Sequence, residues 1–112
     1  MKDSEIYAIV LGQVIAAARG TAGLSQRALA EQVGMQQSTL SRVETGRLDL
    51  SPFFLKRVAE ETGHTTANLQ QRVDAVFART QAALSYLLPS ESASGWEHAL
   101  PGMVAFLIAA EA

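Results

Sequence analysis

The 112-residue sequence has no cysteine, few aromatic residues and no long apolar run. The lack of cysteine excludes disulfides and thiolate metal sites, which fits a reducing compartment. Its most apolar stretch, residues 100–110, is far shorter than the about 18 residues that a membrane-spanning helix needs. The first residues, Met-Lys-Asp-Ser-Glu, are acidic where a signal peptide has a basic start. We therefore expect a cytoplasmic protein without a membrane partner.

Patterns typical of enzymes and metal sites are also missing. The only histidines, His64 and His98, are far apart in the sequence and have no cysteine near them, so they make no metal-binding spacing. No serine lies in a nucleophile motif, and no glycine-rich loop is suited to bind phosphate. The sequence predicts neither an enzyme nor a metal or other cofactor.

The charges are few and unevenly distributed. The formal net charge is −2, whereas DNA-binding modules usually carry a basic surplus. From Arg19 to Arg57, however, six basic residues stand against three acidic ones, a local charge of +3, and the remainder carries −5. A positive segment on an acidic body favours a defined orientation on DNA.

Residues 24–46 predict two short helices joined by a tight turn. Ser25 is suited to cap the start of the first helix, and Gly34 can adopt the positive φ that ends it. The second helix directs Leu40 and Val43 inward. Its outer surface is polar and consists of Gln36, Gln37, Ser38, Ser41 and Arg42. This is the outline of a helix-turn-helix that enters the major groove of DNA.

Other helices flank this unit and predict an all-α fold. The first runs from Asp3 or Ser4 to Arg19, and its early apolar residues Ile6 and Tyr7 need a packing partner. A fourth helix starts at Ser51-Pro52 and ends at Gly63. A fifth starts at Thr65 or Thr66 and is stopped by Pro89, with a length of roughly 30 Å.

The end of the sequence is apolar and less clearly patterned. Ser90 to Gly95 has the composition of a linker. Residues 96–112 are expected to form a short apolar helix with Pro101 near its start. A strand over Met103 to Ile108 is the alternative, because the run is short and its period ambiguous.

The stretch from Leu24 to Gly46 resembles the lambda-repressor-like, or Cro/repressor-type, helix-turn-helix regulators, also called the xenobiotic-response-element (XRE) family of bacterial transcription factors. The resemblance covers residues 10–70. It rests on the common spacing of Gln26, Ala30, Gly34, Gln37, Glu44 and Gly46. It implies a five-helix, lambda-repressor-like DNA-binding domain, which we place at residues 1–70. Residues 1–9 and 85–112 exceed the family pattern, and residues 71–112 are expected to form a dimerisation extension because of their surplus apolar residues.

The resemblance also suggests roles for single residues. A glutamine amide can bond adenine N7 and N6 together, so Gln37 is the first candidate for base contact. The family implies that Gln26 contacts phosphate and supports Gln37, and that Arg19 and Glu44 form a structural ion pair. The remaining base candidates are Ser38, Arg42, Gln36 and Thr39, and the remaining phosphate candidates are Arg27 and Arg47. The sequence departs from the family at Ala28, where an acidic residue often completes a capping box.

One such helix contacts too few base pairs for specificity, so a homodimer on double-stranded DNA is expected. Trp96, Met103 and Phe106 could line a ligand pocket, but such residues more often lie in a core or an interface. The predicted dimer interface comprises Leu84, Leu87, Leu88, Trp96, Leu100, Met103, Val104, Phe106, Leu107 and Ile108, with Ile6 and Tyr7 as further contacts.

The function expected from these features is that of a sequence-specific transcriptional regulator, a repressor on a palindromic operator. Two alternatives belong to other classes. One is an antitoxin that binds a toxin through its C-terminal part and regulates its own operon. The other is an adaptor that keeps the fold and bridges proteins.

Overall fold

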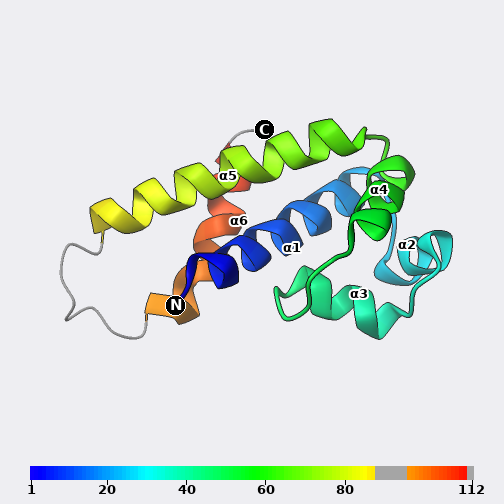
Figure 1. Ribbon diagram of the computed structural model, residues 1–112, viewed down its shortest axis with the longest axis horizontal. Helices are drawn as coiled ribbons and strands as arrows, with labels where there is room; N and C mark the ends of the chain where they lie inside the picture. Colours follow the sequence, from blue (N-terminus) through cyan, green and yellow to red (C-terminus); the bar gives the residue numbers. More distant parts are fainter. Residues whose placement is uncertain (88–95, 111–112) are drawn as a thin grey trace.

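The computed structural model describes residues 1–87 and 96–110, which form helices and no strand (Figure 1). The elements are α1 (Asp3–Thr21), α2 (Gln26–Val33), α3 (Gln37–Glu44), α4 (Pro52–Glu61), α5 (Thr66–Leu87), the short 3₁₀ turn η1 (Trp96–Ala99) and α6 (Leu100–Ala110). The predicted all-α fold is confirmed, with long first and fifth helices and an additional apolar helix at the end.

Local capping residues explain where the helices of the helix-turn-helix begin and end. The Ala28 N–H donates to Ser25 Oγ over 3.0 Å and so caps the start of α2. Gly34 ends α2 with a φ of 82°, the left-handed conformation that glycine adopts without strain. Gln36 is the N-cap residue of α3 and not its first helical residue, and its side chain makes no capping bond.

Helix α1 runs through the middle of the molecule and contacts α3, α5 and α6. Its buried residues include Val10, Val14 and Ala18. Gly12 lies against the end of α3 so closely that a Cβ atom there would be 2.3 Å from the Val43 carbonyl oxygen and 2.6 Å from that of Glu44. Only glycine allows the backbones of α1 and α3 to approach this far.

The surplus apolar residues at the start of α1 find their partners within the chain. Ile6 is buried, and the Tyr7 ring packs edge-on against Phe77 of α5 with centroids 5.1 Å apart. The Tyr7 hydroxyl donates to Asp74 Oδ1 over 3.2 Å and accepts a hydrogen bond from the Gln70 amide. Burial raises the pKa of Tyr7 above its ordinary value. Ile6 and Tyr7, expected as further contacts of the dimer, are thus packed within the single chain, Tyr7 against α5.

The C-terminal segment is a helix, which decides against the strand alternative for Met103–Ile108. Leu100, Val104 and Ile108 are buried where α6 packs against α1 and α5. Their place in the predicted dimer interface is corrected, because they belong to the core of the single chain. Trp96, Met103 and Leu84 are half-buried against the same core.

Two of the predicted interface residues fall at the edge of what the structure describes. Leu88 lies outside the described residues, and so does the side chain of Leu87. Leu107 is half-buried and Phe106 is exposed. The predicted linker from Ser90 to Gly95 also lies outside the described residues.

Within residues 1–87 and 96–110, no single helix has the length and apolar composition to cross a membrane. Among these described residues, α1 and α2 reach the required length and apolar composition only when they are taken together, and they are bent by 101° relative to each other.

Candidate nucleic-acid interface

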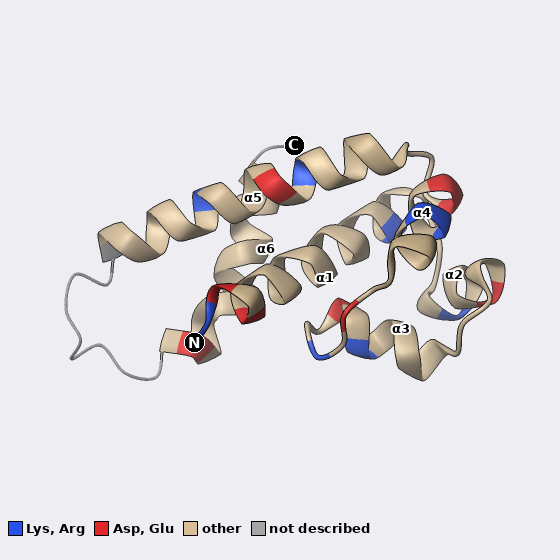
Figure 2. Cartoon of the chain, viewed as in Figure 1, with Lys and Arg blue, Asp and Glu red and all other residues tan. Residues whose placement is uncertain are grey.

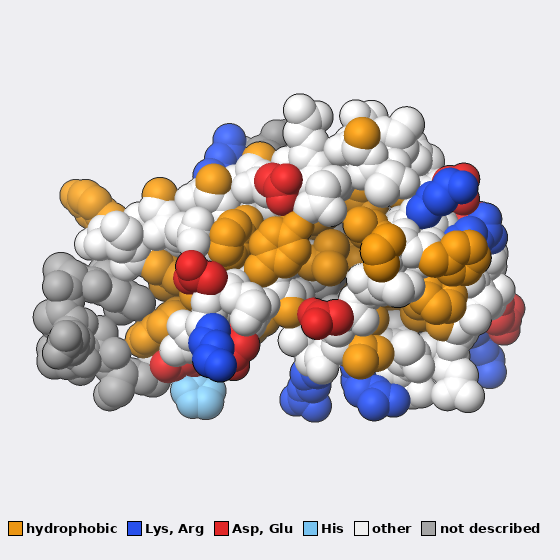
Figure 3. Space-filling view, viewed as in Figure 1, with side chains coloured by type: hydrophobic (Ala, Val, Ile, Leu, Met, Phe, Trp, Pro, Cys, Tyr) orange, Lys and Arg blue, Asp and Glu red, His pale blue; other side chains and the backbone are white. Residues whose placement is uncertain are grey.

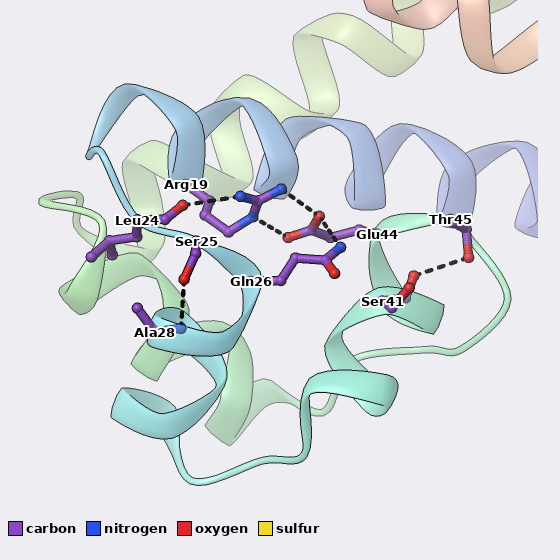
Figure 4. Close-up of polar contacts among 8 residues, drawn as sticks. All are labelled: Arg19, Leu24, Ser25, Gln26, Ala28, Ser41, Glu44 and Thr45. Carbon is purple, nitrogen blue, oxygen red and sulfur yellow. Dashed lines mark hydrogen bonds and ion pairs between the residues drawn. The ribbon is translucent and has the colours of Figure 1, made fainter.

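A partly buried ion pair fixes the position of α3 relative to α1 (Figure 4). Arg19 Nε donates to Glu44 Oε2 over 2.7 Å, and Arg19 Nη2 donates to Glu44 Oε1 over 3.0 Å. The Glu44 side chain is only 5% exposed and that of Arg19 is 20% exposed. The hydrogen bond to Glu44 is the main cause that raises the pKa of Arg19 above its ordinary value. The paired geometry is bidentate, which restricts orientation as well as distance.

The ion pair is also bonded to the turn before α2 and to the first residue of α2. Arg19 Nη1 donates to the Leu24 carbonyl over 3.0 Å, and Gln26 Nε2 donates to Glu44 Oε1 over 2.9 Å. The network of Arg19, Gln26 and Glu44, here called the Glu44 network, thus joins α1, α2 and the end of α3. A second N–H of the Gln26 amide remains for another acceptor.

The outer face of α3 presents polar groups that have no partner among the described residues. Gln37, Ser38 and Arg42 are exposed, while Leu40 and Val43 on the opposite face are buried. In the part of the chain that the structure describes, no hydrogen bond or ion pair engages the side chains of these three residues. Gln36, the N-cap residue, is exposed beside them, and Thr39 is half-buried.

The turn after α3 is held against α1. The Thr45 hydroxyl donates to the Ser41 carbonyl over 3.0 Å, which closes the last turn of α3. Gly46 has a φ of 77°, and a Cβ atom there would be 2.7 Å from Ile9 Cγ1 of α1. The Arg47 N–H donates to the Arg42 carbonyl over 2.8 Å. These contacts place Arg47 directly beyond the C-terminal end of α3.

Four of the six basic residues between Arg19 and Arg57 are exposed at the surface. Arg19 belongs to the Glu44 network, and Arg57 binds the Gln32 carbonyl over 2.9 Å and the Glu61 carboxylate over 3.2 Å. The exposed ones are Arg27, Arg42, Arg47 and Lys56. Basic side chains of α2, α3 and the following loop lie along the edge that the helix-turn-helix forms (Figures 2 and 3). Two exposed acidic residues, Glu31 of α2 and Asp49 of the loop, lie in the same segments.

Two residues that position this surface could not be identified as such from the sequence. Gly12 was not singled out, because a glycine inside a helical pattern carries no sign of what it contacts. The bond from Gln26 to Glu44 was also missed, although both residues were named for other roles. The common spacing with the family was the one available signal for Gln26.

Two short helices joined at a left-handed glycine, the second with an exposed polar face, define a DNA-binding helix-turn-helix protein. A family model described as "Helix-turn-helix domain" matches residues 10–70. The chain belongs to this family and is a DNA-binding transcriptional regulator of the XRE type.

Solved structures show the same fold. The chain is similar to the clp gene regulator ClgR from Corynebacterium glutamicum, with 24% identity and a TM-score of 0.65 over 75% of this chain and 96% of that one. A second structure of that regulator matches with 26% identity and a TM-score of 0.58, over 62% of this chain and 88% of that one. No match was found among curated proteins.

Proposed function

We propose that the chain is a repressor that binds a palindromic operator as a homodimer, with α3 of each copy in the major groove. The observation that supports this most directly is the outer face of α3, where exposed polar side chains have no partner inside the described chain. The Glu44 network gives this face a fixed orientation relative to α1 and α2. A surface that is polar, unpaired and rigidly held is suited to bind base edges.

Base contact is assigned to the first turns of α3. The amide of Gln37 offers one donor and one acceptor in a plane, which fits N7 and N6 of adenine. Ser38 lies beside it, and Arg42 follows one turn later with a planar guanidinium that fits O6 and N7 of guanine. Gln36 and Thr39 border these three and are assigned secondary contacts.

Phosphate contact is assigned to both ends of the helix-turn-helix. Gln26, the first residue of α2, has a free backbone N–H and a second side-chain N–H while it holds Glu44. Arg27 follows on the same exposed turn, and Arg47 lies beyond the end of α3. Contacts of this kind orient the protein on the duplex and carry no direct sequence information.

The homodimer follows from the size of the recognition unit. One α3 covers only a few base pairs, so two copies related by a two-fold axis are needed for useful specificity. Half-sites are then expected about 10 bp apart, one turn of DNA. In this proposal residues 1–70 contact DNA and residues 71–112 contribute to pairing. The two parts share one core, because α5 runs from residue 66 to residue 87 and so crosses the boundary at residue 70. Repression would follow when the dimer covers a promoter.

Selection of bound duplexes from a random library tests the proposal. The expected product is a palindrome with adenine within each half-site opposite Gln37. A single unrepeated half-site would contradict the homodimer, and no enriched sequence would contradict specific DNA recognition. If the chain instead copurifies with a second small protein that binds it tightly, the antitoxin alternative is favoured.

A further inference from the structure

Helix α6 is apolar on every side, although only one side of it is covered. Its eleven residues, Leu-Pro-Gly-Met-Val-Ala-Phe-Leu-Ile-Ala-Ala, include no charged or hydrogen-bonding side chain. The side with Leu100, Val104 and Ile108 packs into the core. The opposite side, here called the outer face of α6, is exposed and consists of Pro101, Gly102, Ala105, Phe106, Ala109 and Ala110. A helix that is apolar all round is normally buried all round.

Phe106 is the largest residue on this outer face, and it is 71% exposed. Burial of an exposed phenyl ring against another apolar surface would lower the free energy. Exposed rings that border small residues are typical anchors of protein interfaces.

Gly102 lies in the first turn of α6, on the outer face, and no contact within the single chain explains it. A Cβ atom at Gly102 would meet no atom within 4 Å, and its φ is not among the positive values found at other glycines. Glycine lowers the stability of a helix relative to alanine. A glycine at this position would let a helix from another molecule approach α6 closely, because the distance between packed helices depends on the side chains at the contact.

A shallow groove borders the outer face and extends the apolar surface onto α1 and α5. Its walls are Gln13, Ala16, Ala17 and Thr21 of α1, Arg72 of α5, and Ala105, Ile108 and Ala109 of α6. Most of these side chains are small, and Arg72 is the only charged one. The surface is therefore nearly neutral over its whole width.

We propose that the outer face of α6 is the contact through which two copies of this chain pair. The inference rests on the homodimer of the proposed function and names its interface. A second copy fits the charge, because an isologous contact places the same face on both sides, and a face without charged side chains meets itself without repulsion. DNA does not fit, because the face offers no cation to the phosphates apart from Arg72 at its edge.

The outer face of α6 alone is too small for a stable dimer. A helix of eleven residues is roughly 16 Å long and about 10 Å wide, so α6 alone buries far less than the about 800 Å² per partner of a stable interface. The α1 and α5 walls of the groove must therefore contribute. We expect dissociation in the micromolar range in solution and stronger pairing on an operator, where both copies are held on one duplex.

Sedimentation equilibrium of the full chain tests this inference with two variants and one control. Phe106→Glu places a charge on each side of the contact, and Gly102→Leu adds bulk where the single chain has open space. Phe53→Glu is the matched control, because it makes the same substitution at another exposed phenylalanine. Phe53 is 63% exposed and lies on α4, and α4 and α6 are not one of the main pairs of helices in contact. Circular dichroism checks that each variant keeps its helices.

The expected result is that both α6 variants raise the dissociation constant by roughly 30-fold or more, as for loss of a central interface residue, while Phe53→Glu leaves it unchanged. If all four proteins dimerise alike, the α6 interface is wrong and the homodimer stands. If the wild type stays monomeric and occupies single half-sites, both are wrong. If α6 variants lose the dimer but the wild type selects no DNA sequence, the interface stands and the proposed function fails.

Discussion

At the scale of residues, substitutions of Gln37 and Arg47 distinguish base contact from phosphate contact. Gln37→Ala removes a planar donor and acceptor from an exposed position of α3. We expect a loss of about 1–3 kcal/mol on the selected operator and a relaxed preference at one base pair. Titration against operators with every base at that position measures both effects. An equal loss on random DNA would contradict base contact by Gln37.

Arg47→Ala removes an exposed cation beyond the end of α3. We expect binding to weaken similarly on operator and random duplexes, because a phosphate contact is independent of sequence. The dependence of log K on log salt concentration should become shallower by about one. An unchanged salt dependence, or a loss confined to the operator, would show that Arg47 does not act through phosphate.

Arg19→Leu tests the Glu44 network as a structural element. The substitution leaves the Glu44 carboxylate, which is 5% exposed, with the Gln26 amide as its remaining partner. Loss of one member of a fully buried pair costs about 3–5 kcal/mol, and the partial exposure of Arg19 points to the lower end. Urea unfolding measures the change. A loss under about 0.5 kcal/mol, the size of an ordinary surface substitution, would contradict a structural role.

At the scale of elements, the helices of the DNA-binding part could be predicted because their boundaries depend on local chemistry. The cap at Ser25, the left-handed Gly34 and the pair Ser51-Pro52 each act on backbone groups a few residues away. The partner of α6 could not be predicted in the same way. An apolar segment shows that it must be buried, but the residues that cover it lie far away in the sequence.

Gly12 determines how closely α1 and α3 approach each other, and Gly20 in the same helix offers a matched control. A Cβ at Gly12 would meet the Val43 carbonyl at 2.3 Å, so Gly12→Ala must push α1 and α3 apart. Overpacking of this kind costs about 1–3 kcal/mol. Gly20 lies in the same helix with nothing within 4 Å, so Gly20→Ala should be neutral or stabilise by up to about 1 kcal/mol. Urea unfolding of both variants measures the difference, and equal effects would contradict the close approach.

At the scale of the whole molecule, the helices that carry the candidate residues could be predicted from the sequence, but the packing partners of its apolar end could not. The base candidates lie on α3 and its N-cap, and the phosphate candidates lie on the first turn of α2 and directly after α3. The predicted interface combined two kinds of residue, because Leu100 and Val104 point into the core whereas Phe106 is exposed. Which side of α6 is covered depends on its packing against α1 and α5, and the sequence of α6 does not distinguish its sides.

Truncation after Leu87 follows from this arrangement. The shortened chain loses three side chains that are buried in the core, Leu100, Val104 and Ile108, and exposes the parts of α1 and α5 beneath them. Each such side chain contributes about 1.5–3 kcal/mol by burial, and the total is comparable with the about 5–15 kcal/mol by which a domain is stable.

We therefore expect the truncated chain to melt at a much lower temperature, or to lack a cooperative transition, and not to behave as a stable monomer of the same fold. Thermal unfolding followed by circular dichroism measures this, with Phe106→Glu as the control that should lose pairing and keep the core. A truncated chain that melts like this control would show that α6 stabilises only the dimer. The buried side of α6 would then contribute nothing to the single chain, contrary to its packing against α1 and α5.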